Sequence, residues 1–195
     1  MKLNFHSALL KLFTAIIVTL LAPTITYAQS VDDYKRMAEQ GDAEAQYNLG
    51  LYYLNEGDSQ DYIEAVRWLR KAADRDYADA QVLLGSCYVL GYGVTINYKE
   101  ALELFRKAAA QDNVGAYSML GICYYEQQNN KEAVKWLRKA AEQGDATAQY
   151  YLGLCYYRGK GVRKDHEEAL RWFRMAAEQG YNDAQKRLND MGEIW

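Results

Sequence analysis

Residues 146–177 read ATAQYYLGLCYYRGKGVRKDHEEALRWFRMAA, and the same order of small, leucine and tryptophan positions recurs through the chain. Leu-Gly pairs stand at Leu49-Gly50, Leu84-Gly85, Leu120-Gly121 and Leu152-Gly153. The Ala-Ala pairs move with them, at Ala72-Ala73, Ala108-Ala109, Ala140-Ala141 and Ala176-Ala177. The period is roughly 35 residues, which predicts a solenoid of stacked helix pairs.

Each unit contains two helical patterns with four-residue or near four-residue spacing. The first helices share an alanine, a leucine and a tyrosine on one face: Ala45, Leu49, Tyr53; Ala80, Leu84, Tyr88; Ala116, Leu120, Tyr124; Ala148, Leu152, Tyr156. The second helices share two alanines around a bulky residue: Ala65, Trp68, Ala72; Ala101, Leu104, Ala108; Ala133, Trp136, Ala140; Ala169, Trp172, Ala176. Both faces are expected to be buried. A glycine inside a helix costs ~1 kcal/mol, so the four Leu-Gly glycines indicate helix contacts too close for a Cβ.

Helix boundaries repeat as well. The second helices begin with an Asp/Asn-x-x-Glu signal, which predicts a capping box at Asp61/Glu64, Asn97/Glu100, Asn129/Glu132 and Asp165/Glu168. They end at residue types that accept a left-handed backbone, namely Gly41, Asp76, Asp112, Gly144 and Gly180.

The string Ala-x-Ala-Gln-x-x-Leu-Gly-x-x-Tyr-x-x-Gly-x-Gly-Val, followed by Glu-Ala-x-x-Trp-x-x-x-Ala-Ala, resembles the Sel1-like repeat (SLR), a relative of the tetratricopeptide repeat. Unit two keeps Gly91, Gly93 and Val94, whereas unit three lacks the glycine loop and should have a tight, tetratricopeptide-like turn. The resemblance covers roughly residues 34–188. It implies an all-α, right-handed superhelical solenoid whose concave face binds a protein or peptide, often in the bacterial envelope or in secretion.

The chain is expected to form a single solenoid domain of about ten helices behind a signal peptide. Residues 1–28 show the signal pattern: Lys2 and Lys11, the apolar run 12–22, and a small-residue cleavage site ending at Ala28. The expected boundaries are 29–41 for an N-terminal capping helix, 42–76, 77–112, 113–144 and 145–180 for four helix pairs, and 181–195 for a C-terminal capping helix. Export to the periplasm or the medium follows from this organisation.

Removal of residues 1–28 leaves positions 29–195, which contain no proline and carry a formal charge of −5, since two of the 23 basic residues and none of the 26 acidic ones are lost. Proline-free composition favours helix throughout. The negative charge argues against a nucleic-acid binder. The apolar run 12–22 is too short for a bilayer, which takes about 20 apolar residues to cross as a helix. We therefore expect no transmembrane segment, and we expect a monomer.

Cys87, Cys123 and Cys155 occupy one repeat position, three residues after the leucine. Equivalent helices of neighbouring repeats lie ~8–10 Å apart, beyond the ~7 Å limit for a disulfide, so we predict buried free thiols with no disulfide. One exposed thiol or an intermolecular bridge is the alternative. His166 lies beside an expected capping residue and is interpreted as an exposed first-turn histidine. No metal site, cofactor or catalytic residue is expected.

Basic residues gather on the second helices: Arg67, Arg70, Lys71, Arg106, Lys107, Lys135, Arg138, Lys139, Arg171 and Arg174. Several have a glutamate three residues earlier, which favours a solvated convex face. A strip for a polyanionic partner is the alternative.

The candidate partner-binding residues lie on the first helices, beside the packing face. In the concave surface we place Tyr47, Leu51, Val82, Ser86, Ser118, Ile122, Tyr125, Tyr150, Leu154 and Tyr157, with Leu54 and Val89 on the same stripe. If exposed, this apolar stripe would bind a peptide or protein. Alternatively, it packs against the next repeat.

Three functions remain open. The first is a non-catalytic protein- or peptide-binding scaffold or adaptor of the cell envelope. The second is a cell-wall-related enzyme or peptidoglycan-fragment binder, which the absence of a convergent nucleophile and base disfavours. The third is a secreted inhibitor or host-interaction factor, which would use the same scaffold.

Overall fold

The computed structural model describes residues 31–56 and 58–193, and the expected signal peptide, residues 1–28, lies outside this part. The described residues form ten helices and no strand, as predicted for an all-α solenoid. Their bounds are α2 Val31–Glu39, α3 Ala43–Glu56, α4 Ser59–Ala73, α5 Ala78–Leu90, α6 Tyr98–Ala109, α7 Val114–Glu126, α8 Asn130–Glu142, α9 Ala146–Arg158, α10 His166–Glu178 and α11 Asn182–Asp190. None of these helices combines the length and apolarity that crossing a bilayer requires.

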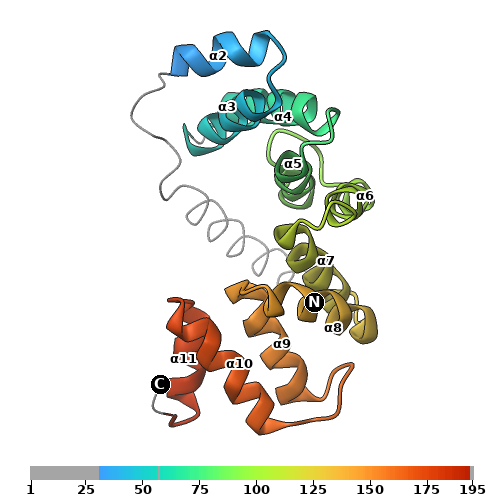
Figure 1. Ribbon diagram of the computed structural model, residues 1–195, viewed down its shortest axis with the longest axis vertical. Coiled ribbons are helices and arrows are strands. Elements are labelled where there is room, and N and C mark those ends of the chain that lie inside the picture. Colours follow the sequence, from blue (N-terminus) through green and yellow to red (C-terminus); the bar gives the residue numbers. More distant parts are fainter. Residues whose placement is uncertain (1–30, 57, 194–195) are drawn as a thin grey trace. The chain divides into compact units, whose positions relative to one another are not determined.

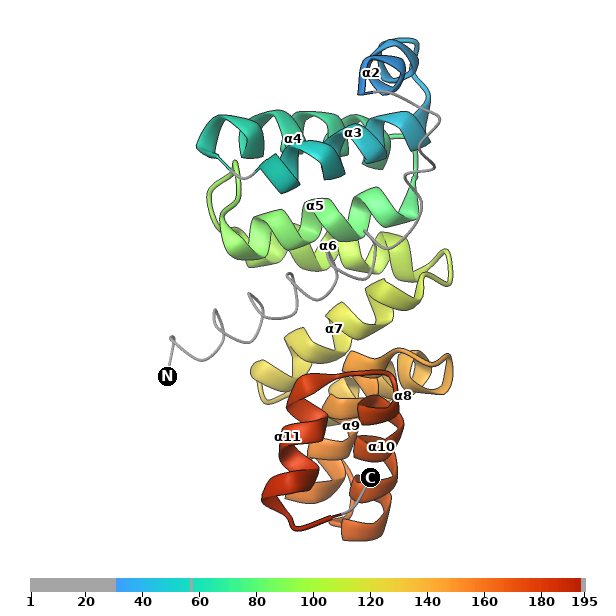
Figure 2. The ribbon, with the colours of Figure 1, turned by 90° about the vertical axis from the view of Figure 1, so that its left-hand side faces the viewer.

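The helices group into two compact units, one ending at Gln111 and the other beginning at Asp112. Unit 1 contains α2 to α6 and unit 2 contains α7 to α11 (Figure 1). Within a unit each helix packs on the next, so α3 and α4, or α5 and α6, lie side by side (Figure 2). Each unit thus holds two helix pairs and one lone terminal helix, α2 packing on α3 and α11 on α10.

The Leu-Gly glycines mark the closest approach inside each pair, as predicted. A Cβ on Gly50 or Gly121 would lie 2.6 Å from Cγ of a leucine on the second helix, Leu69 or Leu137. A Cβ on Gly85 or Gly153 would lie 2.6 Å from ring atoms of Phe105 or Phe173. At each of these glycines, one large side chain of the second helix therefore packs directly against the backbone of the first helix.

The predicted left-handed residues at the ends of the second helices are confirmed. Their φ angles are +94° at Gly41, +91° at Gly144 and +82° at Gly180, and +58° at both Asp76 and Asp112. The backbone reverses there and leads into the next first helix.

Of the predicted capping boxes, the bond to the cap side chain forms at two helix starts and is absent at the other two. Asn97 and Asp165 cap α6 and α10 by accepting from the N–H of Glu100 and Glu168. Asn129 precedes α8, but its side chain makes no capping bond. The prediction of Asp61 is wrong, because α4 begins earlier, at Ser59.

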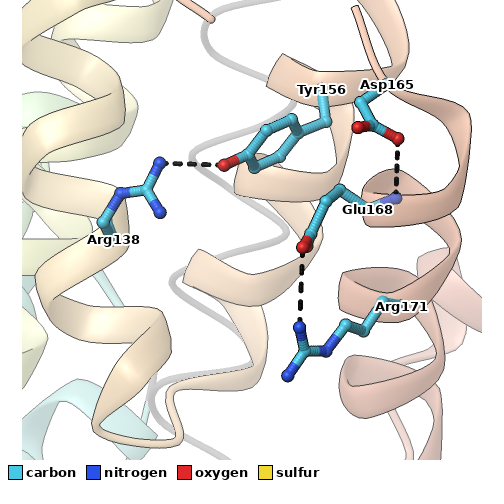
Figure 3. Close-up of polar contacts among 5 residues, drawn as sticks. All are labelled: Arg138, Tyr156, Asp165, Glu168 and Arg171. Atoms are coloured by element: carbon cyan, nitrogen blue, oxygen red, sulfur yellow. Dashed lines mark hydrogen bonds and ion pairs between the residues drawn. The ribbon is translucent and has the colours of Figure 1, made fainter.

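Asp58 is the residue that caps α4, through bonds from the backbone N–H groups of Gln60 and Asp61. Even at α10 the box is only half formed. The N–H of Asp165 donates to the carbonyl of Tyr156. The carboxylate of Glu168 pairs instead with Arg171 (Figure 3).

A glutamine at the start of most first helices ties it to the preceding second helix. The Nε2 atoms donate to carbonyls eight residues earlier: Gln46 to Ala38, Gln81 to Ala73, Gln149 to Ala141 and Gln185 to Ala177. These side chains donate hydrogen bonds to carbonyls at the end of the preceding helix, which have no partner within that helix. Stacking of one repeat on the next is therefore specified by hydrogen bonds as well as by apolar packing.

Candidate partner-binding surface

Most of the predicted partner-binding stripe is buried in the structure. Tyr150 and Tyr157 are half-buried, but each of the other eight exposes 8% or less of its surface: Tyr47, Leu51, Val82, Ser86, Ser118, Ile122, Tyr125 and Leu154. Leu54 and Val89 are buried too. The expectation that this stripe is exposed is thus wrong for all but two of its residues, while partner binding itself stays a prediction.

The physical reason is that a first helix is covered around most of its circumference. In α5 ten of the 13 residues are buried, and in α7 nine of 13. By contrast, α6 buries five of 12 residues, as an amphipathic surface helix does. A helix with apolar residues on all sides is usually buried in a protein interior. The apolar residues beside the packing face of the first helices are therefore part of a wider buried face.

The tyrosines four residues after each leucine are half-buried rather than buried. Two of them accept a hydrogen bond from an arginine of the preceding second helix. Arg70 donates to the hydroxyl of Tyr88 at 2.7 Å, and Arg138 donates to that of Tyr156 at 2.9 Å (Figure 3). Each guanidinium also lies over the ring of its tyrosine. Sequence reasoning missed these contacts between repeats. The available signal was the constant spacing of Arg and Tyr, 18 positions in both repeats.

Other basic residues of the second helices form the predicted pairs along the helix surface. Arg67 lies 3.1 Å from Glu64, Lys135 3.6 Å from Glu132, and Arg171 3.5 Å from Glu168. Such exposed pairs are worth about 0–1 kcal/mol. Together with the Arg-Tyr contacts they engage much of the basic strip within the protein, which favours the solvated-face interpretation.

Half-buried aromatic residues gather in unit 2. The Tyr150 ring lies 5.2 Å from that of Tyr181 and 5.7 Å from that of Phe173. Tyr157, two turns further along α9, has the His166 ring at 4.9 Å. We call the three half-buried tyrosines Tyr150, Tyr157 and Tyr181 the unit-2 aromatic surface.

Cations border this surface. Arg158 donates to the hydroxyl of the buried Tyr125, and Lys160 Nζ lies 4.6 Å from the centre of the same ring. The Tyr125 ring contacts Tyr151, which in turn contacts Tyr150. A chain of ring contacts therefore connects Lys160 to the aromatic surface.

One acidic group lies among these cations. Burial raises the pKa of Glu126, while the nearby charges of Lys160 and Arg158 oppose that rise. Burial also raises the pKa of the Tyr151 and Tyr181 hydroxyls, which stay neutral. The edge near Tyr125 thus carries two cations and one carboxyl group, whereas the carboxylates of Asp183 and Asp145 lie close to Tyr181.

The cysteines are buried, as predicted, and are free thiols. Burial raises the pKa of Cys87, Cys123 and Cys155 to about 12, so the nucleophilic thiolate is scarce at neutral pH. His166 is exposed at the first position of α10, as expected. Among residues 31–193, where described, no three His, Cys, Asp or Glu side chains are placed to hold a metal ion.

The repeat geometry agrees with comparisons to known proteins. The profile of the Sel1 repeat matches residues 43–77, 78–113 and 146–181. The chain belongs to the Sel1 repeat family. The tetratricopeptide repeat profile matches residues 97–155, which include the third repeat with its short connection between α7 and α8. Repeats of these two kinds are generally non-catalytic scaffolds that bind other proteins.

Two solved structures resemble this Sel1 repeat protein over most of its length. A protective antigen of uropathogenic Escherichia coli with an SLR fold is 36% identical, with a TM-score of 0.77 over 86% of this chain and 37% of that one. A Sel1 repeat protein from Oxalobacter formigenes is 40% identical, with a TM-score of 0.75 over 81% of this chain and 65% of that one.

An F-box protein of Arabidopsis thaliana is 41% identical over 59 residues, which are 30% of this chain and 16% of that protein. In all three cases this Sel1 repeat protein spans less than two thirds of the relative. The similarity therefore concerns the repeats that the proteins share.

Proposed function

We propose that this Sel1 repeat protein is an exported, non-catalytic scaffold that binds another protein or a peptide through the unit-2 aromatic surface. The observation that carries the proposal is the half-burial of Tyr150, Tyr157 and Tyr181, while the rest of the predicted stripe is covered. Tyrosine supplies a large, rigid contact area with a polar tip, which is why it is frequent among residues that dominate binding.

The surroundings of these rings also suit binding. Tyr150 is braced by Phe173, which is fully buried, and by Tyr151, which is 7% exposed. A ring held by its neighbours loses little rotamer freedom when a partner covers it, so more of the contact energy appears as affinity. Tyr150 and Tyr157 are seven positions apart on α9, a spacing that places them on one helix face.

Site-specific photo-crosslinking tests this proposal. With p-benzoylphenylalanine at Tyr157, irradiation of living cells should yield a discrete adduct whose partner mass spectrometry identifies. Tyr98 in unit 1, which is 39% exposed, provides a matched position on another surface. Adducts of the same partner in equal yield at both positions would contradict the proposal.

The purified partner then allows a quantitative test. Tyr150→Ala with Tyr157→Ala should weaken binding at least tenfold, because two hot-spot rings of ~1–2 kcal/mol each are removed. Tyr98→Ala should leave the affinity unchanged. If the double variant binds as tightly as the wild type, the aromatic surface is not the binding surface.

Export is supported by the pattern of residues 1–28 and is testable separately. The mature protein recovered from cells should begin at Gln29, as read by N-terminal sequencing, and should fractionate with the periplasm or the medium. Recovery of an intact N-terminus from the cytoplasmic fraction would refute export.

A further inference from the structure

The last residue of α9 and the connection from α9 to α10 carry the densest positive charge of the chain. Residues 158–164 read RGKGVRK, with four cations and no acidic residue in seven positions. Arg163 and Lys164 are exposed. No acidic side chain of the described residues forms an ion pair with either of them. We call residues 158–164 the basic loop.

The backbone of the basic loop is fixed. Gly159 and Gly161 have φ angles of +68° and +73°, and a Cβ on Gly161 would overlap the carbonyl oxygen of Asn130 on α8. The N–H of Lys160 donates to the carbonyl of Cys155, and a Cβ on Gly159 would lie 3.2 Å from that of Lys164. The loop therefore presents its cations from a defined frame and loses little backbone entropy on binding.

The second repeat contains the same loop with different chemistry. Gly91 and Gly93 also have positive φ angles, and a Cβ on Gly93 would overlap the carbonyl oxygen of Tyr62 on α4. At the positions of Lys160, Arg163 and Lys164, the second repeat has Tyr92, Thr95 and Ile96. Because both loops are docked by the same glycine contact, the cations are not required by the loop geometry. Their presence needs another reason.

The basic loop adjoins the aromatic surface at its C-terminal end, where it leads through Asp165 into His166, whose ring contacts Tyr157. Lys160 lies over Tyr125, and the buried rings of Tyr125 and Tyr151 separate it from Tyr150. A segment lying across the tyrosines would therefore reach the cations.

We propose that the basic loop selects an acidic segment of a protein partner, with carboxylates facing Arg163 and Lys164 and apolar or aromatic side chains on the tyrosines. This inference rests on the proposed function and names the chemistry of the partner. Complementary charge gives specificity and a faster association more than raw affinity.

A peptide fits better than a dense polyanion. The carboxyl group of Glu126 lies near Arg158 and Lys160 and would repel closely spaced phosphates, whereas carboxylates along a peptide can be spaced around it. The rings next to the cations favour a ligand that also carries apolar side chains.

Fluorescence anisotropy of the mature protein with three labelled ten-residue peptides tests the inference. The peptides share two tyrosines and differ only in the remaining residues, which are Glu, Gln or Lys. The Glu peptide should bind roughly tenfold tighter than the Gln peptide at low salt, the Lys peptide weakest, and the preference should shrink at high salt.

The second repeat supplies the matched variant. Lys160→Tyr, Arg163→Thr and Lys164→Ile transplant its loop and should reduce the preference for Glu over Gln to less than twofold. Lys160→Gln, Arg163→Gln and Lys164→Gln should do the same without adding apolar surface, in case the transplant fails to fold. Arg67→Gln, Lys107→Gln and Lys135→Gln make the same change in net charge on the second helices, and should leave the preference intact.

Three outcomes would overturn the inference. One is an equal loss of preference in the loop and second-helix variants, which would indicate a general charge effect. Another is tight binding of polyphosphate or of phosphatidylglycerol vesicles without binding of the Glu peptide, which would indicate a polyanion or membrane surface. The third is tyrosine-dependent binding of all three peptides with equal affinity, in which case the proposed function survives and the charge selection fails.

Discussion

Replacement of Gly121 by alanine is a direct test of the helix contacts that organise each pair. The new Cβ would lie 2.6 Å from Cγ of Leu137 and 2.9 Å from its backbone nitrogen. Ordinary contact begins at 3.4 Å, so Leu137 must retreat by about 0.8 Å in an interior that is packed as densely as a crystal. The main chain of α8 has to move with it, because the backbone nitrogen is one of the atoms in the way.

Two effects of opposite sign decide the magnitude. Alanine favours a helix over glycine by ~1 kcal/mol, and overpacking of a core costs ~1–3 kcal/mol. Because α8 itself has to shift, the cost should lie near the upper end, and the net loss of unfolding free energy should be about 2 kcal/mol. For a unit of this size that lowers Tm by roughly 8 °C or more.

Gly153→Ala is the matched comparison. Its nearest atoms belong to the ring of Phe173, at 2.6 Å and 2.7 Å, and the nearest backbone atom is the Ala169 oxygen at 3.3 Å. The ring can tilt without displacing the helix, so the loss should be smaller, about 1 kcal/mol. Urea titrations followed by circular dichroism in the far ultraviolet give both values.

A double variant separates the side-chain contribution. Leu137→Ala removes the leucine atoms nearest the new Cβ, so Gly121→Ala should cost less in that background than in the wild type. The reasoning would be refuted if Gly121→Ala stabilised the protein, as helix propensity alone requires, or if Gly153→Ala cost more than Gly121→Ala.

Three further predictions concern single groups. The buried Oε1 of Gln46 has no hydrogen-bond partner among the described residues, whereas in repeats two and four the equivalent glutamine accepts a bond from a second glutamine, whose place Arg75 takes in repeat one. Arg75→Gln should therefore raise the unfolding free energy by about 1 kcal/mol and shift the urea midpoint upward. An unchanged midpoint would show that the bond does not form. Asp165→Ala should cost ~1 kcal/mol through the lost helix cap, whereas Asn129→Ala, which removes no capping bond, should be nearly neutral in the same titration. The three thiols, whose pKa burial raises to about 12, should react with Ellman's reagent at mildly alkaline pH only after denaturation, and fast reaction of the native protein would show an exposed cysteine.

The sequence predicted the repeats and the glycine contacts because both depend on local periodicity. A glycine retained within every first helix has few explanations other than a close approach, and Gly50 and Gly153 show that approach. The left-handed residues were equally predictable, since few residue types accept that conformation. The start of α4 was not, because Asp58 and Asp61 are both good capping residues and only the folded chain selects between them.

The candidate surface shows where local pattern stops being informative. Tyr47 and Tyr150 are both tyrosines two residues before the leucine of their repeat, but Tyr47 is buried and Tyr150 is half-buried. No local property distinguishes them, because burial depends on which neighbouring helices cover each position.

By itself the sequence determined the helical class, the repeat length, most of the helix ends and the glycines at which paired helices meet, since each follows from the conformational preference or spacing of residues close in the chain. Only the tertiary structure decided which tyrosines are covered, which arginines donate hydrogen bonds to Tyr88 and Tyr156, and that Lys160 of the basic loop lies over the buried ring of Tyr125. These contacts join residues that lie on different helices or loops, and they exist only once one helix pair has packed on the next.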